Sequence, residues 1–451
     1  MSVILIKVLQ FFVSLSLLVM IHEFGHYIAA RIFKIRVEKF YLFFNPWFSI
    51  CKRKIGDTTY GVGWLPLGGY VSLSGMIDES MNVEQMKQEP QPWEFRTKPA
   101  WQRLIVMLAG VFMNVILAMI IYSGILFTWG EQYLDNANVK YGYEFSAAGE
   151  ELGFEDGDRI VSIDNEVIGD ANSIGRMLLI SDGDRKVDIV RHGEPMTITV
   201  TLDKLVAMRE SESYVGLYNP IVAPFIVDST SSESAAMAGF RHGDQIVAVG
   251  DKPIYSGELI REELANYKDK EANIVVLRHE TDELGKSIAV RDTLTTRINN
   301  KGQIGVILQP VDAVGLTHIE YGFFESIPAG IKLASKEIAS YWNQLKMIVN
   351  PDTKLYKEVG GFLSIGNVFP DTWDWRRFWS ITALISIMLA VMNLLPIPGL
   401  DGGHALFTLY EIITRRKPSD KFMEVMQWIG LFLLFALLIY ANGNDIFKLF
   451  S

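Results

Sequence analysis

Two histidines and a glutamate end an apolar run, in the stretch VMIHEFGHYIAA at residues 19–30. Positions four apart on a helix share a face, so His22 and His26 can direct their imidazole nitrogens at one metal ion. Glu23 lies beside them, where its carboxylate can take a proton from water. Zinc in a three-ligand site lowers the pKa of water to about 7, which gives a nucleophile for hydrolysis at neutral pH. The stretch predicts a hydrolytic zinc site that still needs a third protein ligand.

The setting of this motif separates it from a chance match. The same pattern occurs on soluble helices, where its side chains are ordinary surface residues. Here it directly follows a run of membrane length, where a charged side chain costs about 2.5–3.5 kcal/mol on insertion scales. Metal coordination offsets that cost, so we interpret the three side chains as a metal site.

Four apolar stretches are long enough to be membrane spans. They are Val3 to Ile21, Leu104 to Trp129, Phe378 to Leu395 and Val425 to Ala441. The first is longer than the apolar part of a signal peptide and lacks a small-residue cleavage site before the motif, so we expect a retained span. Because 21% of the 451 residues are charged, we predict membrane spans combined with extramembrane domains.

Lysine and arginine near the span ends predict the orientation. The segments at residues 31–54 and 415–421 are rich in both and are expected inside, which puts residues 130–377 and both termini outside.

The net charge of −10 argues against binding nucleic acid, which favours a basic surface. The single cysteine, Cys51, excludes an internal disulfide and a CxxC zinc site.

The third metal ligand is expected where the third span ends on the inner side, in NLLPIPGLDGGH at residues 393–404. The predicted topology puts this stretch on the same side of the membrane as His22 and His26. Asp401 and His404 both offer a ligand atom, and chemistry alone does not choose between them. In the alternative interpretation, Asp401 caps a helix that begins after the proline break.

The outer segment contains an internal repeat. GFEDGDRIVSIDNEVI at residues 153–168 aligns without a gap to GFRHGDQIVAVGDKPI at residues 239–254. Each copy reads as a Gly-Asp turn, an alternating strand and a second turn, which predicts two small β-rich domains. The pattern resembles the PDZ signature, and PDZ domains bind an extended peptide by β-augmentation.

Beyond the repeat, apolar residues spaced three and four apart predict an amphipathic helix over residues 323–349. This helix is expected at the outer leaflet, beside the spans or in a soluble domain.

Taken together, these motifs resemble the site-2 proteases, a family of intramembrane zinc metalloproteases, and among them the bacterial type with tandem PDZ domains, the regulators of sigma-E. The resemblance implies that His22, His26 and Asp401 bind Zn²⁺ and that Glu23 is the general base. It also implies that Asn393 hydrogen-bonds the substrate backbone. GVGWLPLGGYVSL at residues 61–73 is similar to the re-entrant β-hairpin of the family, whose edge at Gly68, Gly69 and Tyr70 would receive substrate.

The expected fold is a multi-pass α-helical membrane protein. It has four transmembrane helices, a membrane re-entrant β-hairpin and two inserted extracytoplasmic PDZ-like α+β domains. The expected domains are a first span at 1–30, a cytoplasmic or membrane-associated region at 31–103 and a second span at 104–129. PDZ-like domains follow at 130–218 and 219–311, then a membrane-surface helix region at 312–377 and spans at 378–412 and 422–441.

Three local departures from the family pattern bear on loop geometry and substrate preference. The second span reads GVFMN, which keeps Gly110 and Asn114 but has Val111 in place of proline. A Gly-Pro pair before the third span is Gly361-Phe362 here, and FYLFFNPWFS at residues 40–49 lacks the usual glycine pair before the hairpin.

The resemblance implies a protease of the bacterial inner membrane that cuts within the transmembrane segments of pre-trimmed membrane proteins. Expected substrates are single-span proteins such as an anti-sigma factor, and signal-peptide remnants; the lipid bilayer is the other partner. The active site would lie towards the cytoplasmic side, and the PDZ pair would exclude bulky substrates, bind peptides, or both. A metal-ion transporter and a non-catalytic membrane-anchored PDZ receptor are the alternatives, and the presence of Glu23 beside both histidines favours hydrolysis.

Overall fold

The computed structural model describes residues 3–450, except 77–88, 140–141, 192, 212–215, 222–224, 255–256, 282–286 and 310–315. The chain divides into two compact units. The first combines Met1–Gly130 with Glu320–Ser451, and the second is Glu131–Ile319. Each unit is described by itself.

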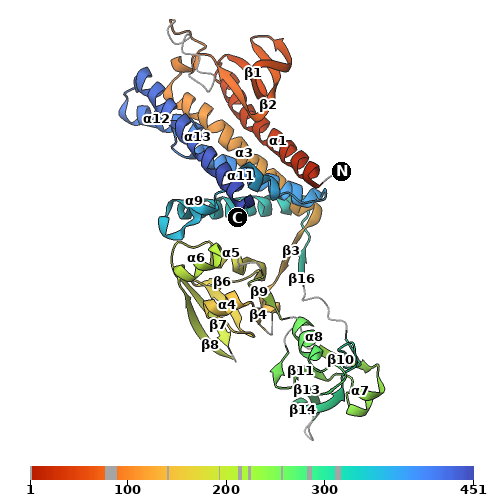
Figure 1. Ribbon diagram of the computed structural model, residues 1–451. Coiled ribbons are helices and arrows are strands. Elements are labelled where there is room, and N and C mark those ends of the chain that lie inside the picture. Colours follow the sequence, from red (N-terminus) through yellow and green to blue (C-terminus); the bar gives the residue numbers. More distant parts are fainter. Residues whose placement is uncertain are drawn as a thin grey trace. The chain divides into compact units, whose positions relative to one another are not determined.

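Among the described residues of the first unit, four helices are long and apolar enough to cross a membrane, as predicted (Figure 1). They are α1 (Val3–Ile32), α3 (Ala100–Trp129), α11 (Trp375–Leu394) and α13 (Asp420–Phe450). The region expected at residues 378–412 consists of two helices, with the break at the two prolines as predicted. Pro396 and Pro398 have no N–H to continue the helix, so α11 ends at Leu394 and a separate helix α12 (Asp401–Thr414) begins.

A long two-stranded sheet, β1 (Val37–Ile55) with β2 (Thr58–Leu73), packs beside α1 (Figure 1). It is larger than the hairpin expected at residues 61–73, because β1 also takes part. Tyr41 pairs with both Tyr70 and Gly61, so the first half of β1 lies between the two halves of β2. The half of β2 that contains Tyr70 is therefore an edge, and no other described strand pairs with it.

The amphipathic helix α9 (Phe323–Val349) packs on α3 through small residues. Ser326, Gly330 and Ala334 are buried, and a Cβ at Gly330 would lie 2.2 Å from Ser123 Oγ. Aromatic side chains such as Phe324, which is 82% exposed, lie on the outside of the helix. The helix therefore lies beside the candidate spans with an apolar outer face.

The end of α13 holds the short helix α10 (Phe362–Asn367) through polar side chains. The Phe362 N–H donates to Asn442 Oδ1 at 3.2 Å, and the Leu363 N–H donates to Asp445 Oδ2 at 3.0 Å. Proline has no N–H and would lose the first of these bonds. Phe362, in place of the proline of the family pattern, therefore supplies a hydrogen bond that holds α10 against α13.

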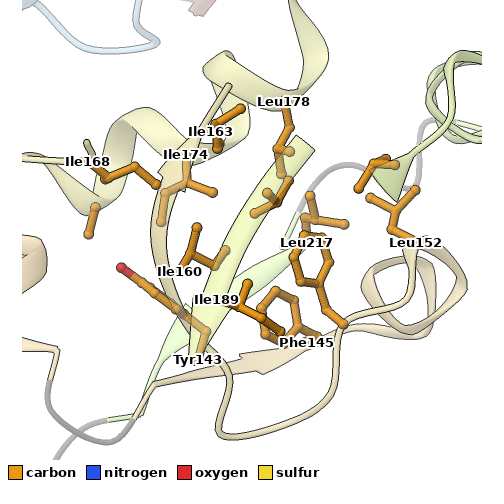
Figure 2. Close-up of a cluster of buried hydrophobic side chains, with 14 of the residues drawn as sticks. Tyr143, Phe145, Leu152, Ile160, Ile163, Ile168, Ile174, Leu178, Ile189 and Leu217 are labelled. Atoms are coloured by element: carbon orange, nitrogen blue, oxygen red, sulfur yellow. The ribbon is translucent and has the colours of Figure 1, made fainter. Parts of the chain in front are cut away.

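The second unit contains two hydrophobic cores built from the same order of elements. Each runs helix, strand, short strand and hairpin, giving sheet orders β6-β5-β7-β8 and, with further strands, β12-β11-β13-β14. Figure 2 shows the first core, where Tyr143, Ile160 and Leu178 are fully buried.

The elements around the first core are β4 (Tyr143–Phe145), α4 (Ala147–Leu152), β5 (Arg159–Ile163), β6 (Glu166–Val167), α5 (Ile174–Leu179), β7 (Arg185–Arg191), β8 (Glu194–Val200), α6 (Leu202–Glu210) and β9 (Tyr218–Pro220). Those around the second core are β10 (Phe225–Thr230), α7 (Glu233–Ala238), β11 (Gln245–Val249), β12 (Lys252–Pro253), α8 (Gly257–Ala265), β13 (Glu271–Thr281), β14 (Ser287–Arg297) and β15 (Val306–Leu308).

A buried ion pair recurs at the same place in both copies. Arg191 donates two hydrogen bonds to Asp158, at 2.8 and 2.7 Å. Arg278 donates two to Asp244, both at 2.8 Å. Burial alone would raise the pKa of Asp244, but the hydrogen bonds from Arg278 and from the Arg241 N–H hold that pKa below its usual value. The aspartate of each Gly-Asp turn thus fixes its turn against the hairpin.

A short ribbon joins the two ends of the inserted unit. Strand β3 (Glu131–Leu134) pairs with β16 (Leu316–Ile319) in antiparallel register, Leu134 opposite Leu316 and Glu131 opposite Ile319. The inserted unit therefore extends to Ile319, past the boundary expected at residue 312.

Candidate metal centre

His22 and His26 lie one turn apart on α1 and face the same point. Each residue is only 7% exposed. Their Nε2 atoms are 3.3 Å apart, and their ring centroids are 4.9 Å apart. The i, i+4 spacing thus brings both imidazoles together inside an apolar helix.

Asp401 completes a three-atom group with the two histidines. Its Oδ2 lies 3.0 Å from His22 Nε2 and 3.2 Å from His26 Nε2. The N-cap residue of α12 is Leu400, and Asp401 is the first helical residue, so its carboxylate does not act as the helix cap considered above. Glycines make this approach possible, since a Cβ at Gly402 would lie 2.3 Å from the Leu395 carbonyl oxygen.

The three atoms fit a zinc ion. Zinc–ligand bonds of about 2.0–2.2 Å in tetrahedral geometry separate neighbouring ligand atoms by about 3.4 Å, close to the spacings found here. The buried Oδ2 of Asp401 has no hydrogen-bond donor among the described residues. A buried acceptor facing two imidazole nitrogens calls for a cation. His22, His26 and Asp401 form a group of potential ligands in the described part of the chain.

Helix α3 orients the two imidazoles. His26 Nδ1–H donates to the Val106 carbonyl oxygen at 2.8 Å, which leaves the Nε2 lone pair for the metal. The side-chain amide of Asn114 lies 3.3 Å from His22 Nδ1, and its Oδ1 has no partner in its present orientation. After a half-turn of the amide about its χ2 bond, Oδ1 can accept a hydrogen bond from the Nδ1–H of His22. Both rings then carry their proton on Nδ1 and direct the lone pair of Nε2 at the metal position.

Gly110 provides the space for the histidine rings against α3. A Cβ at this position would lie 2.4 Å from His26 Nε2 and 2.8 Å from His22 Cε1. In the sequence, only the match of GVFMN to the family pattern points to Gly110. Residue types and spacing do not show that position 110 touches the metal ligands.

The remaining predicted site residues line one cavity beside the metal group, with a volume of about 340 Å³. Glu23 lies in its wall and accepts a hydrogen bond from the Val71 N–H on β2. Asn393, at the end of α11, places its Nδ2 3.5 Å from His22 Nε2. Gly68, Gly69, Tyr70 and His404 also line the cavity, with His404 outside the three-atom group.

Glycine also brings β2 close to the metal-binding helix. A Cβ at Gly69 would lie 2.8 Å from Val19 Cγ1 and 3.6 Å from Glu23 Cγ. The opposite side of the site is fixed by an ion pair, in which Arg103 on α3 donates to Glu411 on α12 at 2.5 Å. This pair holds the helix that begins with Asp401 beside α3. Breaking a buried pair by removing one partner typically costs about 3–5 kcal/mol.

Two histidines at i, i+4, a distant carboxylate, and a glutamate in the same cavity match the donor set and base that metallopeptidases use in catalytic zinc sites. Comparison with known proteins agrees. The chain belongs to peptidase family M50, whose profile matches residues 10–437.

Relatives of similar length carry a matching name. A protein of Xylella fastidiosa (strain 9a5c) named "Putative zinc metalloprotease" is 28% identical over 447 residues, covering 96% of this chain and 97% of the relative. Proteins with the same name from Thermotoga maritima and Vibrio cholerae are 26% and 25% identical and cover 97% and 100% of this chain, and 98% and 100% of their own lengths. The chain is a membrane-integral zinc metallopeptidase.

Proposed function

We propose that the protein hydrolyses peptide bonds inside membrane-spanning segments of other proteins. The observation that carries the proposal is the position of the ligands: His22 and His26 lie in a helix long and apolar enough to cross a membrane. A protease whose metal site lies at such depth can reach only substrates that are themselves in the membrane.

The chain's own side chains divide the chemistry between them. Zinc, when bound by His22, His26 and Asp401, supplies a Lewis acid that polarises the substrate carbonyl and acidifies water. Glu23 takes the proton from the attacking water as the new C–O bond forms. It then gives that proton to the leaving nitrogen as the C–N bond breaks. The Val71 N–H keeps the Glu23 carboxylate in the wall of the cavity.

The edge of β2 suits an unwound substrate. A helical segment uses its backbone N–H and C=O groups internally, so it must become extended before water can attack. An extended segment can add to the edge at Gly68, Gly69 and Tyr70 by backbone hydrogen bonds, and that edge lines the same cavity as Glu23. The side-chain amide of Asn393 would hydrogen-bond the substrate backbone beside the metal.

The finer assignments rest on the family resemblance. We propose that the substrates are pre-trimmed single-span proteins, such as an anti-sigma factor, and signal-peptide remnants. The membrane would be the bacterial inner membrane, with the two inserted domains, proposed to be PDZ-like, outside. A gating or peptide-binding role of those domains stays a prediction.

The direct test uses purified protein and synthetic apolar transmembrane peptides in detergent micelles. We expect cleavage inside the apolar segment, complete loss of cleavage after zinc is removed by a chelator, and recovery when zinc is restored. The control peptide has the same composition but carries cleavable residues only outside the apolar segment. Cleavage of the control alone would show that the enzyme acts outside the membrane.

Cysteine labelling tests the proposed orientation. In a Cys51→Ser background, needed because Cys51 is exposed, Ser231→Cys should react with an impermeant thiol reagent in cells with a permeabilised outer membrane. Ser419→Cys should react only after the inner membrane is opened, because the basic link at residues 415–421 is expected inside. Both serines are exposed in the structure, so burial cannot explain protection. The opposite pattern would reverse the proposed topology.

A further inference from the structure

One polar side chain in the wall of the active-site cavity has no role in the chemistry above. Gln427 lies on α13 and is 8% exposed. It has no hydrogen-bond partner among the residues that the structure describes. Its amide atoms keep some exposed surface and open onto the cavity, where an unpartnered amide needs water or substrate as its partner. When a substrate displaces water from the cavity, the substrate must therefore supply the partner of this amide.

The packing of α13 fixes Gln427 at this place. Gly430, one turn further along, lies directly on the loop before Asp401, since a Cβ there would lie 1.4 Å from the Pro398 carbonyl oxygen. Most other side chains of α13 are exposed. At the far end of the helix, Asn442 and Asp445 both have backbone partners in the segment at α10. Gln427 differs from them in facing the cavity.

The rest of the cavity indicates what the partner is. About half of its wall is apolar, with Leu15, Val19, Met76, Met107 and Leu389 among the apolar side chains. Apolar side chains therefore suit the occupant, and its polar groups are those of the backbone. A primary amide offers both N–H donors and a carbonyl acceptor, which match the C=O and N–H of one extended backbone. The charged and metal-binding side chains of this wall are His404, Glu23 and the three residues of the metal group.

We propose that Gln427 binds the backbone of the extended, apolar substrate segment on the side of the cavity away from β2. Figure 1 shows α13 and the β1–β2 sheet on opposite sides of α1 and α3, and both line the cavity. The substrate is thus held between a strand edge and the amide of Gln427, with Asn393 nearer the metal group. This inference rests on the proposed function and adds a substrate-binding residue to it.

The test measures peptide binding as well as cleavage. In a Glu23→Gln background, Gln427→Met keeps the length of the side chain but removes the amide. We expect the Kd for a fluorescent apolar transmembrane peptide to rise about 3- to 10-fold, the usual range for one lost hydrogen bond. Zinc content should stay at about one per chain. The matched control is Gln344→Met on α9, a glutamine outside the cavity that bonds Ser340 Oγ, and its Kd should not change.

Ester-containing peptides locate the contact. Replacing one backbone amide by an ester removes its N–H, so at one position near the scissile bond the ester should weaken binding to the Gln427 protein but not to Gln427→Met. An unchanged Kd in Gln427→Met, or the same ester penalties in both proteins, would overturn the inference. So would loss of zinc in both Gln427→Met and Gln427→Leu, which would make Gln427 a support of the loop before Asp401. If Gln427-dependent binding is found but the active enzyme cuts no transmembrane peptide, the proposed function fails and this inference stands.

Discussion

Replacing Glu23 with glutamine should abolish peptide hydrolysis while the protein keeps about one zinc ion per chain. Glutamine has nearly the shape of glutamate, and its carbonyl oxygen can still accept the Val71 N–H bond. It cannot, however, accept a proton from water. General acid–base catalysis typically contributes about 10²–10⁴-fold, so we expect kcat to fall by at least that range. Zinc analysis and single-turnover cleavage of a transmembrane peptide measure the two effects separately.

The matched control for this substitution is Glu166→Gln, which makes the same chemical change at an exposed position in the inserted unit. It should leave kcat and zinc content unchanged. If Glu23→Gln cuts at the unmodified rate, Glu23 is not the base. A transporter would show a different pattern, since zinc uptake into proteoliposomes would then depend on His22 and His26 but not on a proton-accepting residue 23.

The grouping of His22, His26 and Asp401 was largely predictable because its signals are local. The spacing of His22 and His26 fixes a shared helix face, and the proline break at residues 396–398 marks where a third ligand must come from. The choice of Asp401 over His404 was not decided by the residues themselves. It came from the family resemblance, and the structure places Asp401 Oδ2 3.0 and 3.2 Å from the two histidine Nε2 atoms, with His404 outside that group.

The supporting contacts were beyond prediction from spacing. The backbone carbonyl of Val106 orients the His26 ring. The type of side chain at position 106 therefore gives no sign of this hydrogen bond. Gln427 lies in an ordinary membrane-span pattern, and its direction depends on where Gly430 meets the 398–399 loop. The extent of the sheet was also underestimated, because β1 carries no regular alternation and pairs with both halves of β2.

Replacing Asp401 with asparagine should remove zinc from the protein, whereas His404→Ala should leave zinc at about one per chain. The carboxylate supplies the only anionic atom in the group of three ligands, and asparagine leaves two neutral imidazoles. We expect the zinc affinity of Asp401→Asn to fall by more than the 10- to 100-fold that loss of an outer partner typically causes. Metal analysis after dialysis against a weak chelator measures this directly.

Folding must be separated from metal loss in this comparison, because Asp401 begins α12. That helix is also held by the Arg103–Glu411 ion pair and by the close packing of Gly402 and Gly403, none of which the substitution touches. Asp401→Asn should therefore keep its helix content and elute as the unmodified protein does, yet hold no zinc and cut no peptide. If His404→Ala loses zinc and Asp401→Asn retains it, the carboxylate facing the two histidines is not the ligand, and the third ligand must be His404.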